Sequence, residues 1–333
     1  MARLVIHVGT HKTATTTIQK TFHANRKLLA KHGIHYPNMG RVPGHHGLVT
    51  DWVNLPPVFH LPEGSAAAWQ RLVRETAKGD QTVFLSSEEF SRGHPDNRID
   101  LAKIRSWLDP FEEVRVICTL RDQVSFLQSV YLEISKKKAP MMWATYLSNA
   151  IKRGYAAGLL LDYTQLDDHL LTAFSEHEIE YLDYSTACEG PGILATVLDK
   201  AGCEMDPALL ANGKNVPSAN VSPDPLSAWI AGMIVRPNVP STEMIAFVNE
   251  KLLSALKGPS DTTIFTRSEQ KRVEAVVEPK NAALHQRLAA RQPNFRLSPT
   301  SFPKGIAYRN DLPTGFWLNL SKSLYKGDAP DAA

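Results

Sequence analysis

The sequence has few cysteines and no long apolar run. Its 333 residues include only three cysteines, unequally spaced and without a Cys-x-x-Cys pair: Cys118, Cys188 and Cys203. A disulfide framework or a structural zinc site is therefore not expected, and a reducing compartment fits this usage best. No stretch approaches the roughly 20 apolar residues of a membrane helix, and the N-terminus lacks a signal-peptide pattern. We expect a soluble, cytoplasmic protein without an integral membrane segment.

A strong excess of either charge is also absent. Lysine and arginine total 37, and aspartate and glutamate total 34, which gives a formal net charge of +3. This small excess argues against a nucleic-acid-binding protein but allows anions to be held locally. With 43% hydrophobic residues the chain can bury a core, which excludes disordered and collagen-like classes. We expect one α/β domain over residues 1–297 and an irregular appendage over 298–333.

Short apolar segments alternate with helical patterns through the first half of the chain. Strands are predicted at residues 3–8, 33–37, 82–90, 113–120 and 179–185. Helices are predicted at residues 15–31, 66–78, 142–153 and 164–176. This alternation indicates a three-layer α/β fold, a mainly parallel sheet with helices on both faces, followed by a largely helical C-terminal half. Residues 38–65, rich in Gly, Pro and His, are a predicted substrate loop or lid.

Polar residues gather where three predicted strands end. The clusters are "GTHKTATTT" (9–17), "SSEEF" (86–90) and "RDQVSFLQS" (121–129). Parallel sheets of this class bind ligands at the carboxyl ends of their strands. We therefore expect these three clusters to form one site.

The first cluster places a lysine where a strand gives way to a helix. Lys12 and the backbone N–H groups at a helix start form an anion site, to which threonine hydroxyls add donors. The alternative is that the threonines only cap the helix. A run of three β-branched residues, Thr15 to Thr17, is unfavourable in a helix, so we favour a phosphate or sulfate site.

The nucleotide-kinase signature is missing from this loop. Counting back from Lys12, the two glycine positions of G-x-x-x-x-G-K-[ST] hold His11 and Ile6. At the end of the 113–120 strand, Arg121 precedes Asp122, so no aspartate is well placed for magnesium. We expect no metal in the site.

Two motifs resemble those of sulfotransferases that use 3′-phosphoadenosine 5′-phosphosulfate (PAPS). "HVGTHKTATTTIQ" is similar to their 5′-phosphosulfate loop, and "LRDQVSFLQSVY" is similar to their 3′-phosphate motif. Weaker likenesses, among them "HGIHYP" and "IEYLDYS", are to bacterial carbohydrate-type members. The resemblance implies the P-loop-like sulfotransferase fold, with PAPS as cofactor and PAP as product. One departure is Ala14, where the family usually has glycine, so the loop must keep a negative φ there or the match is weaker.

The resemblance also implies roles for individual residues. Lys12 would stabilise the leaving oxygen of the nucleotide, and Arg121 with Ser129 would bind the 3′-phosphate. Tyr184 would contact the adenine, although a tyrosine at a strand end is more often simply packed. Lys214 is a weaker candidate for the 3′-phosphate. The 5′-phosphate would be held by the backbone and hydroxyls of Thr13, Ala14, Thr15, Thr16 and Thr17.

An acceptor hydroxyl also needs a base. Glu88 is the first choice and Glu89 the next, and burial near anions would raise the pKa of such a carboxylate. The alternative is that Ser87 caps the next helix and the two glutamates only face its positive end. His45 and His46, in the 38–65 loop, are the remaining candidates.

The predicted activity is therefore sulfuryl transfer to a hydroxyl or amine of a small molecule or glycan. A carbohydrate or glycolipid acceptor is favoured by the resemblance alone. Two alternatives stay open. One is an ATP-using phosphotransferase, and the other is a non-catalytic relative that binds a nucleotide or glycan.

Overall fold

The fold is described from a computed structural model covering residues 2–93, 97–211, 223–256, 258, 261–300 and 302–330. These residues form two compact units that interleave along the chain. Unit 1 takes the described residues of Met1–Arg121, Ala157–Ser218 and Pro279–Ser298. Unit 2 takes those of Asp122–Ala156, Ala219–Glu278 and Pro299–Ala333. The expectation of a single domain over 1–297 stays a prediction.

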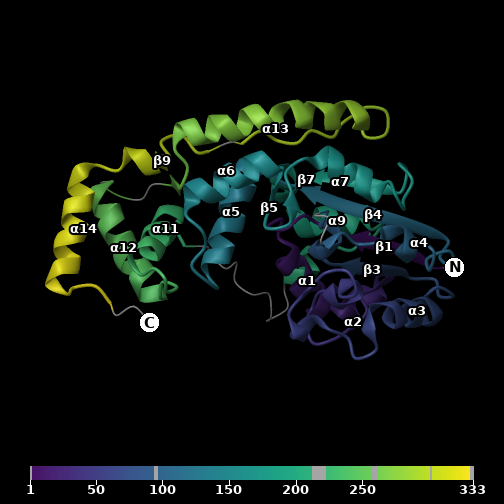
Figure 1. Ribbon diagram of the computed structural model, residues 1–333. Coiled ribbons are helices and arrows are strands. Elements are labelled where there is room, and N and C mark those ends of the chain that lie inside the picture. Colours follow the sequence, from purple (N-terminus) through teal and green to yellow (C-terminus); the bar gives the residue numbers. More distant parts are fainter. Residues whose placement is uncertain are drawn as a thin grey trace. The chain divides into compact units, whose positions relative to one another are not determined.

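Unit 1 is built on a parallel five-stranded sheet (Figure 1). Its strands are β1 (Arg3–His7), β2 (Ile34–His35), β3 (Thr82–Ser86), β4 (Glu113–Leu120) and β7 (Ile179–Asp183). Their order is β2-β3-β1-β4-β7, and every neighbouring pair is parallel. The register pairs His7 of β1 with Ser86 of β3, so the two strands end at the same edge. The predicted parallel α/β sheet is confirmed.

Helices cover both faces of this sheet because residues along each strand alternate between two cores. Leu4 and Ile6 of β1 join the first core, whereas Val5 joins the second. The first core contains residues of α3 (Gly64–Thr76), α4 (Leu101–Arg105), α7 (Tyr163–Leu170) and the end of α13 (Arg267–Leu288). The second contains residues of α1 (Thr15–Ala24), α2 (Arg26–Lys31) and α9 (Ile193–Lys200). The predicted three layers are therefore present.

The Gly- and Pro-rich segment at 38–65 is part of the first core. It forms two short 3₁₀ helices, η1 (His46–Val49) and η2 (Pro57–Phe59). Its buried apolar side chains are Met39, Leu48, Val49, Val53, Leu55 and Leu61. The Trp69 indole of α3 donates to the Leu48 carbonyl at 2.9 Å. Burial on this scale favours a fixed wall over a mobile lid.

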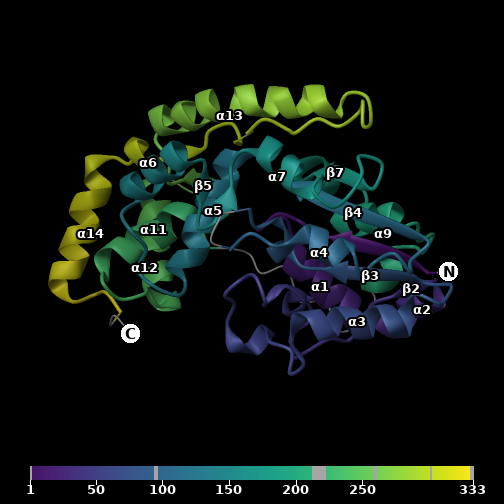
Figure 2. The ribbon, with the colours of Figure 1, turned by 45° about the vertical axis from the view of Figure 1, so that its right-hand side comes forward.

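Unit 2 is mainly helical. It contains α5 (Gln123–Ser135), α6 (Trp143–Arg153), β5 (Tyr155–Ala156), α11 (Pro225–Ile234), α12 (Thr242–Ala255), β8 (Thr262–Thr263), β9 (Ala307–Tyr308), η5 (Arg309–Asp311) and α14 (Thr314–Lys326). Helices α11, α12 and α14 lie together in both views (Figure 1 and Figure 2). The unit boundary falls inside α13, in front of Pro279. Of the remaining elements, all in unit 1, η3 spans Glu88–Ser91, β6 Leu159–Leu160, α8 Tyr184–Cys188 and α10 Ala208–Ala211.

Several local expectations differ from the structure. The strands expected over 33–37 and 179–185 end at His35 and Asp183, and the helix expected over 164–176 ends at Leu170. The helix expected over 15–31 is broken at Asn25, whose side chain donates to the Thr21 carbonyl at 2.8 Å and whose ψ is 19°. The strand expected over 82–90 ends at Ser86, because Ser87 is the N-cap of the short helix η3. The C-terminal segment, expected to be irregular, contains the helix α14. In the part of the chain that the structure describes, we find no helix long and apolar enough to cross a membrane.

Candidate active site

The loop between β1 and α1 adopts a strained backbone. Gly9, Lys12 and Ala14 have φ values of 39°, 66° and 60°. A Cβ at Gly9 would lie 2.5 Å from the Thr15 methyl group, so both the φ and the space require glycine there. The loop stays beside β4, since the Thr10 N–H donates to the Thr119 carbonyl at 2.8 Å. Positive φ at two non-glycine residues marks a site where the fold tolerates strain, as functional loops often do.

The expectation of a negative φ at Ala14 is wrong. Ala14 is in the left-handed region, with φ 60° and ψ 19°. The Cβ of an L-residue crowds the following carbonyl in this conformation, which costs about 1 to 2 kcal/mol. Ala14 therefore adopts a left-handed backbone conformation that is typical of glycine, although the residue is alanine.

The threonines do not cap α1. Ala14 occupies the N-cap position without a side-chain cap, and the first turn contains no acidic residue. The Thr13 hydroxyl donates instead to the Thr10 carbonyl at 2.6 Å. The capping alternative is thus contradicted, and the α1 N-terminus keeps the positive end of its dipole without a carboxylate of its own.

Two buried polar atoms beside this helix start have no hydrogen-bond partner among the described residues: Thr10 Oγ1 and His11 Nδ1. Buried polar groups in folded proteins are nearly always paired, so such atoms indicate a missing ligand or water. Thr15 is buried, whereas Thr16 and Thr17 are exposed. The loop fits an anionic group whose oxygens accept hydrogen bonds.

Arg121 brings the second predicted motif to this loop. Its Nη1 donates to the Lys12 carbonyl at 2.9 Å, and its guanidinium lies 5.2 Å from the ring centre of Tyr184. The Tyr163 hydroxyl fixes the same residue by donating to the Arg121 carbonyl at 2.6 Å. Three residues predicted to bind the cofactor, Lys12, Arg121 and Tyr184, are therefore close together in unit 1.

The two other residues predicted for the 3′-phosphate, Ser129 and Lys214, lie outside the described part of unit 1. Ser129 is half-buried on α5, in unit 2, and its part in a 3′-phosphate site stays a prediction. Lys214 lies outside the described residues.

The carboxylates that follow β3 are held by hydrogen bonds. The Ser87 hydroxyl caps η3 by accepting from the Glu89 N–H at 3.3 Å, as the capping alternative proposed. Gln19 Nε2 donates to Glu88 Oε2 at 2.8 Å. Glu89 is bound on both sides, by His11 Nε2 at 3.3 Å and by the Arg92 guanidinium.

The expected raised pKa of a carboxylate base is wrong for both glutamates. Burial pushes the pKa of Glu88 upward, but the charges of His11 and His46 outweigh burial and leave it below its ordinary value. Burial also acts on Glu89, yet His11 and Arg92 lower the pKa of that carboxyl to about 2. Both groups are therefore carboxylates at neutral pH.

His45 is a structural histidine. Its Nδ1 accepts from the Ser86 N–H at 3.0 Å, and its Nε2 lies 3.0 Å from the Pro37 carbonyl. Burial lowers the pKa of His45 to about 4, so the ring is neutral at pH 7. Both ring nitrogens are occupied, which leaves none to accept a proton from an acceptor.

His46 remains a candidate base. Its Nδ1 lies 2.9 Å from the Ser87 hydroxyl, and its ring packs edge-on against Phe59. A Cβ at Gly44 would lie 2.6 Å from His46 Nε2 and 2.7 Å from Gln19 Oε1. The absence of a side chain at Gly44 therefore leaves space for both of these atoms.

The sequence analysis missed two buried polar residues at the strand ends. His7 ends β1, with its Nδ1 3.0 Å from Ser86 Oγ and its Nε2 3.5 Å from Thr119 Oγ1. Gln19 lies on the buried face of α1 and bonds to Glu88. A polar residue among the apolar positions of a strand and a helix was the available signal.

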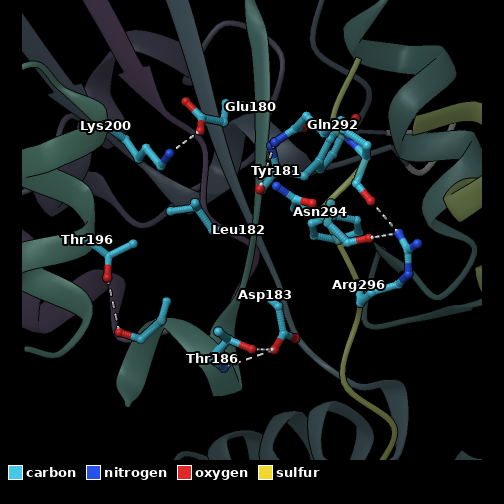
Figure 3. Close-up of a pocket in the computed structure, with 13 residues that line it drawn as sticks. Glu180, Tyr181, Leu182, Asp183, Thr186, Thr196, Lys200, Gln292, Asn294 and Arg296 are labelled. Carbon is cyan, nitrogen blue, oxygen red and sulfur yellow. Dashed lines mark hydrogen bonds and ion pairs between the residues drawn. The ribbon is translucent and has the colours of Figure 1, made fainter. Parts of the chain in front are cut away.

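A cavity of about 460 Å³ lies elsewhere in unit 1, along the edge strand β7 (Figure 3). Lys200 pairs with Glu180 at 2.7 Å on its wall. The Gln292 side-chain amide bonds to the backbone of Tyr181, accepting from its N–H at 2.8 Å and donating to its carbonyl at 3.3 Å. None of the predicted site residues lines this cavity. Among the described residues, no three or more His, Cys, Asp or Glu side chains converge as a metal site would require.

Comparison with known proteins gives only distant likenesses, all to solved structures. No family model matches the chain, and no curated protein matches its sequence. Among solved structures, the chain is similar to the crystal structure of mouse sulfotransferase SULT7A1 complexed with PAP. Sequence identity is 10%, the match covers 87% of each chain, and the TM-score is 0.40. At this similarity the function has to be inferred from the site itself.

Proposed function

We propose that the protein is a PAPS-dependent sulfotransferase that transfers a sulfuryl group to a hydroxyl or amine of an acceptor. The observation that supports this most strongly is the hydrogen bond from Arg121 to the Lys12 carbonyl. It joins two sequence motifs, about 110 residues apart, that resemble the two phosphate-binding motifs of one cofactor. A general anion site would need the Lys12 loop alone, whereas a 3′-phosphorylated nucleotide needs both.

The residues of the loop fit such a cofactor. Thr10 Oγ1 and His11 Nδ1 are buried without partners, and the α1 N-terminus has no acidic residue in its first turn. The backbone N–H groups from Thr13 to Thr17 would hold the 5′-phosphate, and Arg121 the 3′-phosphate. Tyr184, beside the Arg121 guanidinium, would contact the adenine. Ser129 is proposed as a second 3′-phosphate ligand from the motif alone.

The side chains around the loop would have different roles in sulfuryl transfer. When bound, PAPS supplies a sulfuryl group on a phosphate leaving group. The Lys12 ammonium would stabilise negative charge as it develops on the leaving oxygen. Glu88 would accept the proton of the acceptor hydroxyl, with His46 as the alternative base. Glu89, paired with both His11 and Arg92, would hold the loop against η3.

The acceptor is proposed to be a carbohydrate or glycolipid in the cytoplasm. This rests on the likeness of the weaker motifs to bacterial carbohydrate-type sulfotransferases. The buried segment 38–65 contributes His46 beside Ser87, so it would form one wall of the acceptor site.

The cofactor assignment is tested with PAP and AMP, which differ by the 3′-phosphate. We expect PAP to raise the melting temperature far more than AMP, and Arg121→Ala to remove the difference. Arg115→Ala is a matched control, since Arg115 lies on β4, the strand that Arg121 follows, and likewise donates to a backbone carbonyl, that of Lys200 at 3.0 Å. Equal shifts from PAP and AMP in the wild-type protein would contradict the assignment.

The same ligands separate the two alternative functions. An ATP-using phosphotransferase predicts that ATP with magnesium stabilises the fold more than PAP does. A non-catalytic relative predicts binding of PAP without turnover of any acceptor, and no effect of Glu88→Gln. For an enzyme, Lys12→Ala should lower kcat more than it weakens PAP binding, because its charge matters most in the transition state. Acceptors are screened with labelled PAPS.

A further inference from the structure

A buried chain of polar side chains connects the strand ends to Glu88. Gln19 Nε2, on α1, lies 2.8 Å from Glu88 Oε2 and 3.5 Å from Ser86 Oγ. Ser86 Oγ lies 3.0 Å from His7 Nδ1, and His7 Nε2 lies 3.5 Å from Thr119 Oγ1. Gln19 and Ser86 are 4% and 0% exposed. The chain therefore runs from β4 through β1 and β3 to α1 and ends on the carboxylate.

The directions of these hydrogen bonds follow from donor chemistry. An amide nitrogen only donates, so Gln19 can give one N–H to Glu88 and the other to Ser86. The Ser86 hydroxyl then donates to His7 Nδ1, which places the proton of the neutral imidazole on Nε2, facing Thr119. Burial keeps that ring neutral by lowering the pKa of His7 to about 4. A flipped Gln19 amide would turn its carbonyl toward the carboxylate, so only one orientation satisfies the chain.

We infer that Gln19 is a positioning residue for Glu88: it binds one carboxylate oxygen, Oε2, and leaves Oε1 to receive the proton of the acceptor. This inference rests on the proposed function, in which Glu88 is the base. Gln19 is fixed in turn by Ser86 and His7, so the orientation of Glu88 is set by the sheet and not by solvent. Gln19 itself does not touch the reacting atoms.

The charge around Glu88 is set by other groups. The titratable groups that act on it are His7 of β1, His11 of the loop, Tyr36 after β2, His46 of η1 and Glu89 of η3. None of them is changed by substitution of Gln19. A shift in the titration of Glu88 after that substitution would therefore report the lost Gln19 hydrogen bond.

The test replaces the amide donor with an apolar side chain of similar size. Gln19→Leu should lower kcat by about tenfold to a hundredfold, the effect of a misplaced catalytic group, while PAP binding stays unchanged. The acid limb of the kcat/KM profile should move to higher pH, because the carboxylate loses a donor that favours its charged form. Gln19→Met, an unbranched side chain, repeats the test if Gln19→Leu folds poorly. Gln165→Leu is the control, since Gln165 also donates to a carboxylate, that of Asp162 at 3.4 Å.

A second readout does not depend on turnover. With carbon-13-labelled glutamate, the Glu88 carboxyl signal is assigned from its loss in Glu88→Gln and titrated in both proteins. We expect a higher pKa for Glu88 in Gln19→Leu and no change in Gln165→Leu. In the Glu88→Gln background, Gln19→Leu should cost no further activity.

The outcomes separate this inference from the proposed function. No sulfuryl transfer by the wild-type protein with any acceptor would overturn the function, while a shifted Glu88 titration would still support the Gln19 contact. Unchanged kcat, pH profile and Glu88 titration in Gln19→Leu would overturn the positioning role. The positioning role would also be overturned if Gln19→Leu lowered activity by the same factor in the Glu88→Gln background as in the wild-type protein. Gln19 would then act independently of Glu88.

Discussion

The two units place their buried polar groups differently. All twelve histidines of the sequence fall in the segments of unit 1, and His7 and His45 are buried at the ends of its strands. Seven buried side-chain atoms lack a partner in the part of the chain described, and six of them are in unit 1. In unit 2, by contrast, the carboxylates of Glu269 and Asp224 each accept several hydrogen bonds. The contrast favours unit 1 as the location of the proposed site.

Glu269 is typical of unit 2. It accepts from the Thr266 N–H at 2.8 Å, from the Trp143 indole at 3.2 Å and from Arg309 at 2.8 Å. Asp224 likewise accepts from Ser227 and Thr262. Carboxylates with this many donors stabilise helix ends and loops. These two carboxylates of unit 2 thus stabilise the fold itself, whereas the Lys12 loop in unit 1 contains buried polar atoms without a partner among the described residues.

The largest predicted difference between the two units is a loss of stability of unit 1 in mild acid. Burial lowers the pKa values of His7, His45 and His169 to about 4, from 6.5 in the unfolded chain. Between these values the unfolded state binds more protons, so stability is full above pH 6.5 and falls as the pH drops. Going from pH 7 to 5 should cost roughly 2 kcal/mol for each histidine. Urea titrations at both pH values measure the loss, and hydrogen exchange locates it.

In those exchange experiments we expect unit 1 peptides to lose protection first. His45→Gln should reduce the pH dependence, since it removes one of the three titrating groups. Earlier loss of protection in α11, α12 and α14 would show that the histidines are not the weak point.

The next largest effect concerns a buried ion pair of unit 1. Asp167, 1% exposed, pairs with Arg291, 6% exposed, and accepts from the Tyr181 hydroxyl at 2.9 Å. Asp167→Asn leaves the guanidinium buried without its charge partner, which should cost about 3 to 5 kcal/mol in the free energy of unfolding. Asp168→Asn is the control, because Asp168 is 59% exposed and pairs at the surface with Arg287. Chemical denaturation compares the two variants.

A double variant checks the cause of that loss. Asp167→Leu combined with Arg291→Met removes both charges, so it should be more stable than Asp167→Asn. If the double variant were less stable, packing and not the unpaired charge would explain the effect.

The smallest effect is a gain at the loop. Ala14→Gly relieves the left-handed φ, and we expect it to stabilise the protein by up to about 1 kcal/mol, since glycine also gives up more entropy on folding. Ala157→Gly is the matched control, because Ala157 has φ 52° in unit 1 outside the loop. Both should raise the melting temperature, but only Ala14→Gly should change PAP binding. A loss of stability in Ala14→Gly would contradict the strain assigned to this residue.

The sequence predicted the parts of the fold that depend on local patterns. The apolar run at 113–120 is β4, and Lys12 and Arg121 were placed at strand ends because polar residues follow each strand directly. Contacts between residues far apart in the sequence could not be predicted from local patterns. Gln19 meets Glu88 across 69 positions of sequence, and the fixing of His45 depends on Ser86, 41 positions away. The pKa of Glu88 was predicted in the wrong direction because its neighbours His11 and His46 come from other segments.

The hydrogen bonds between the Gln292 amide and Tyr181 protect an edge of the sheet from pairing with another molecule. An outer strand with free N–H and C=O groups is a template on which further chains can polymerise. At one margin of the sheet, β2 is only two residues long. At the other, the Gln292 amide occupies the outward N–H and C=O of Tyr181, at the centre of β7. One side chain thus substitutes for a sixth strand, and its removal by Gln292→Ala would open that margin to intermolecular pairing.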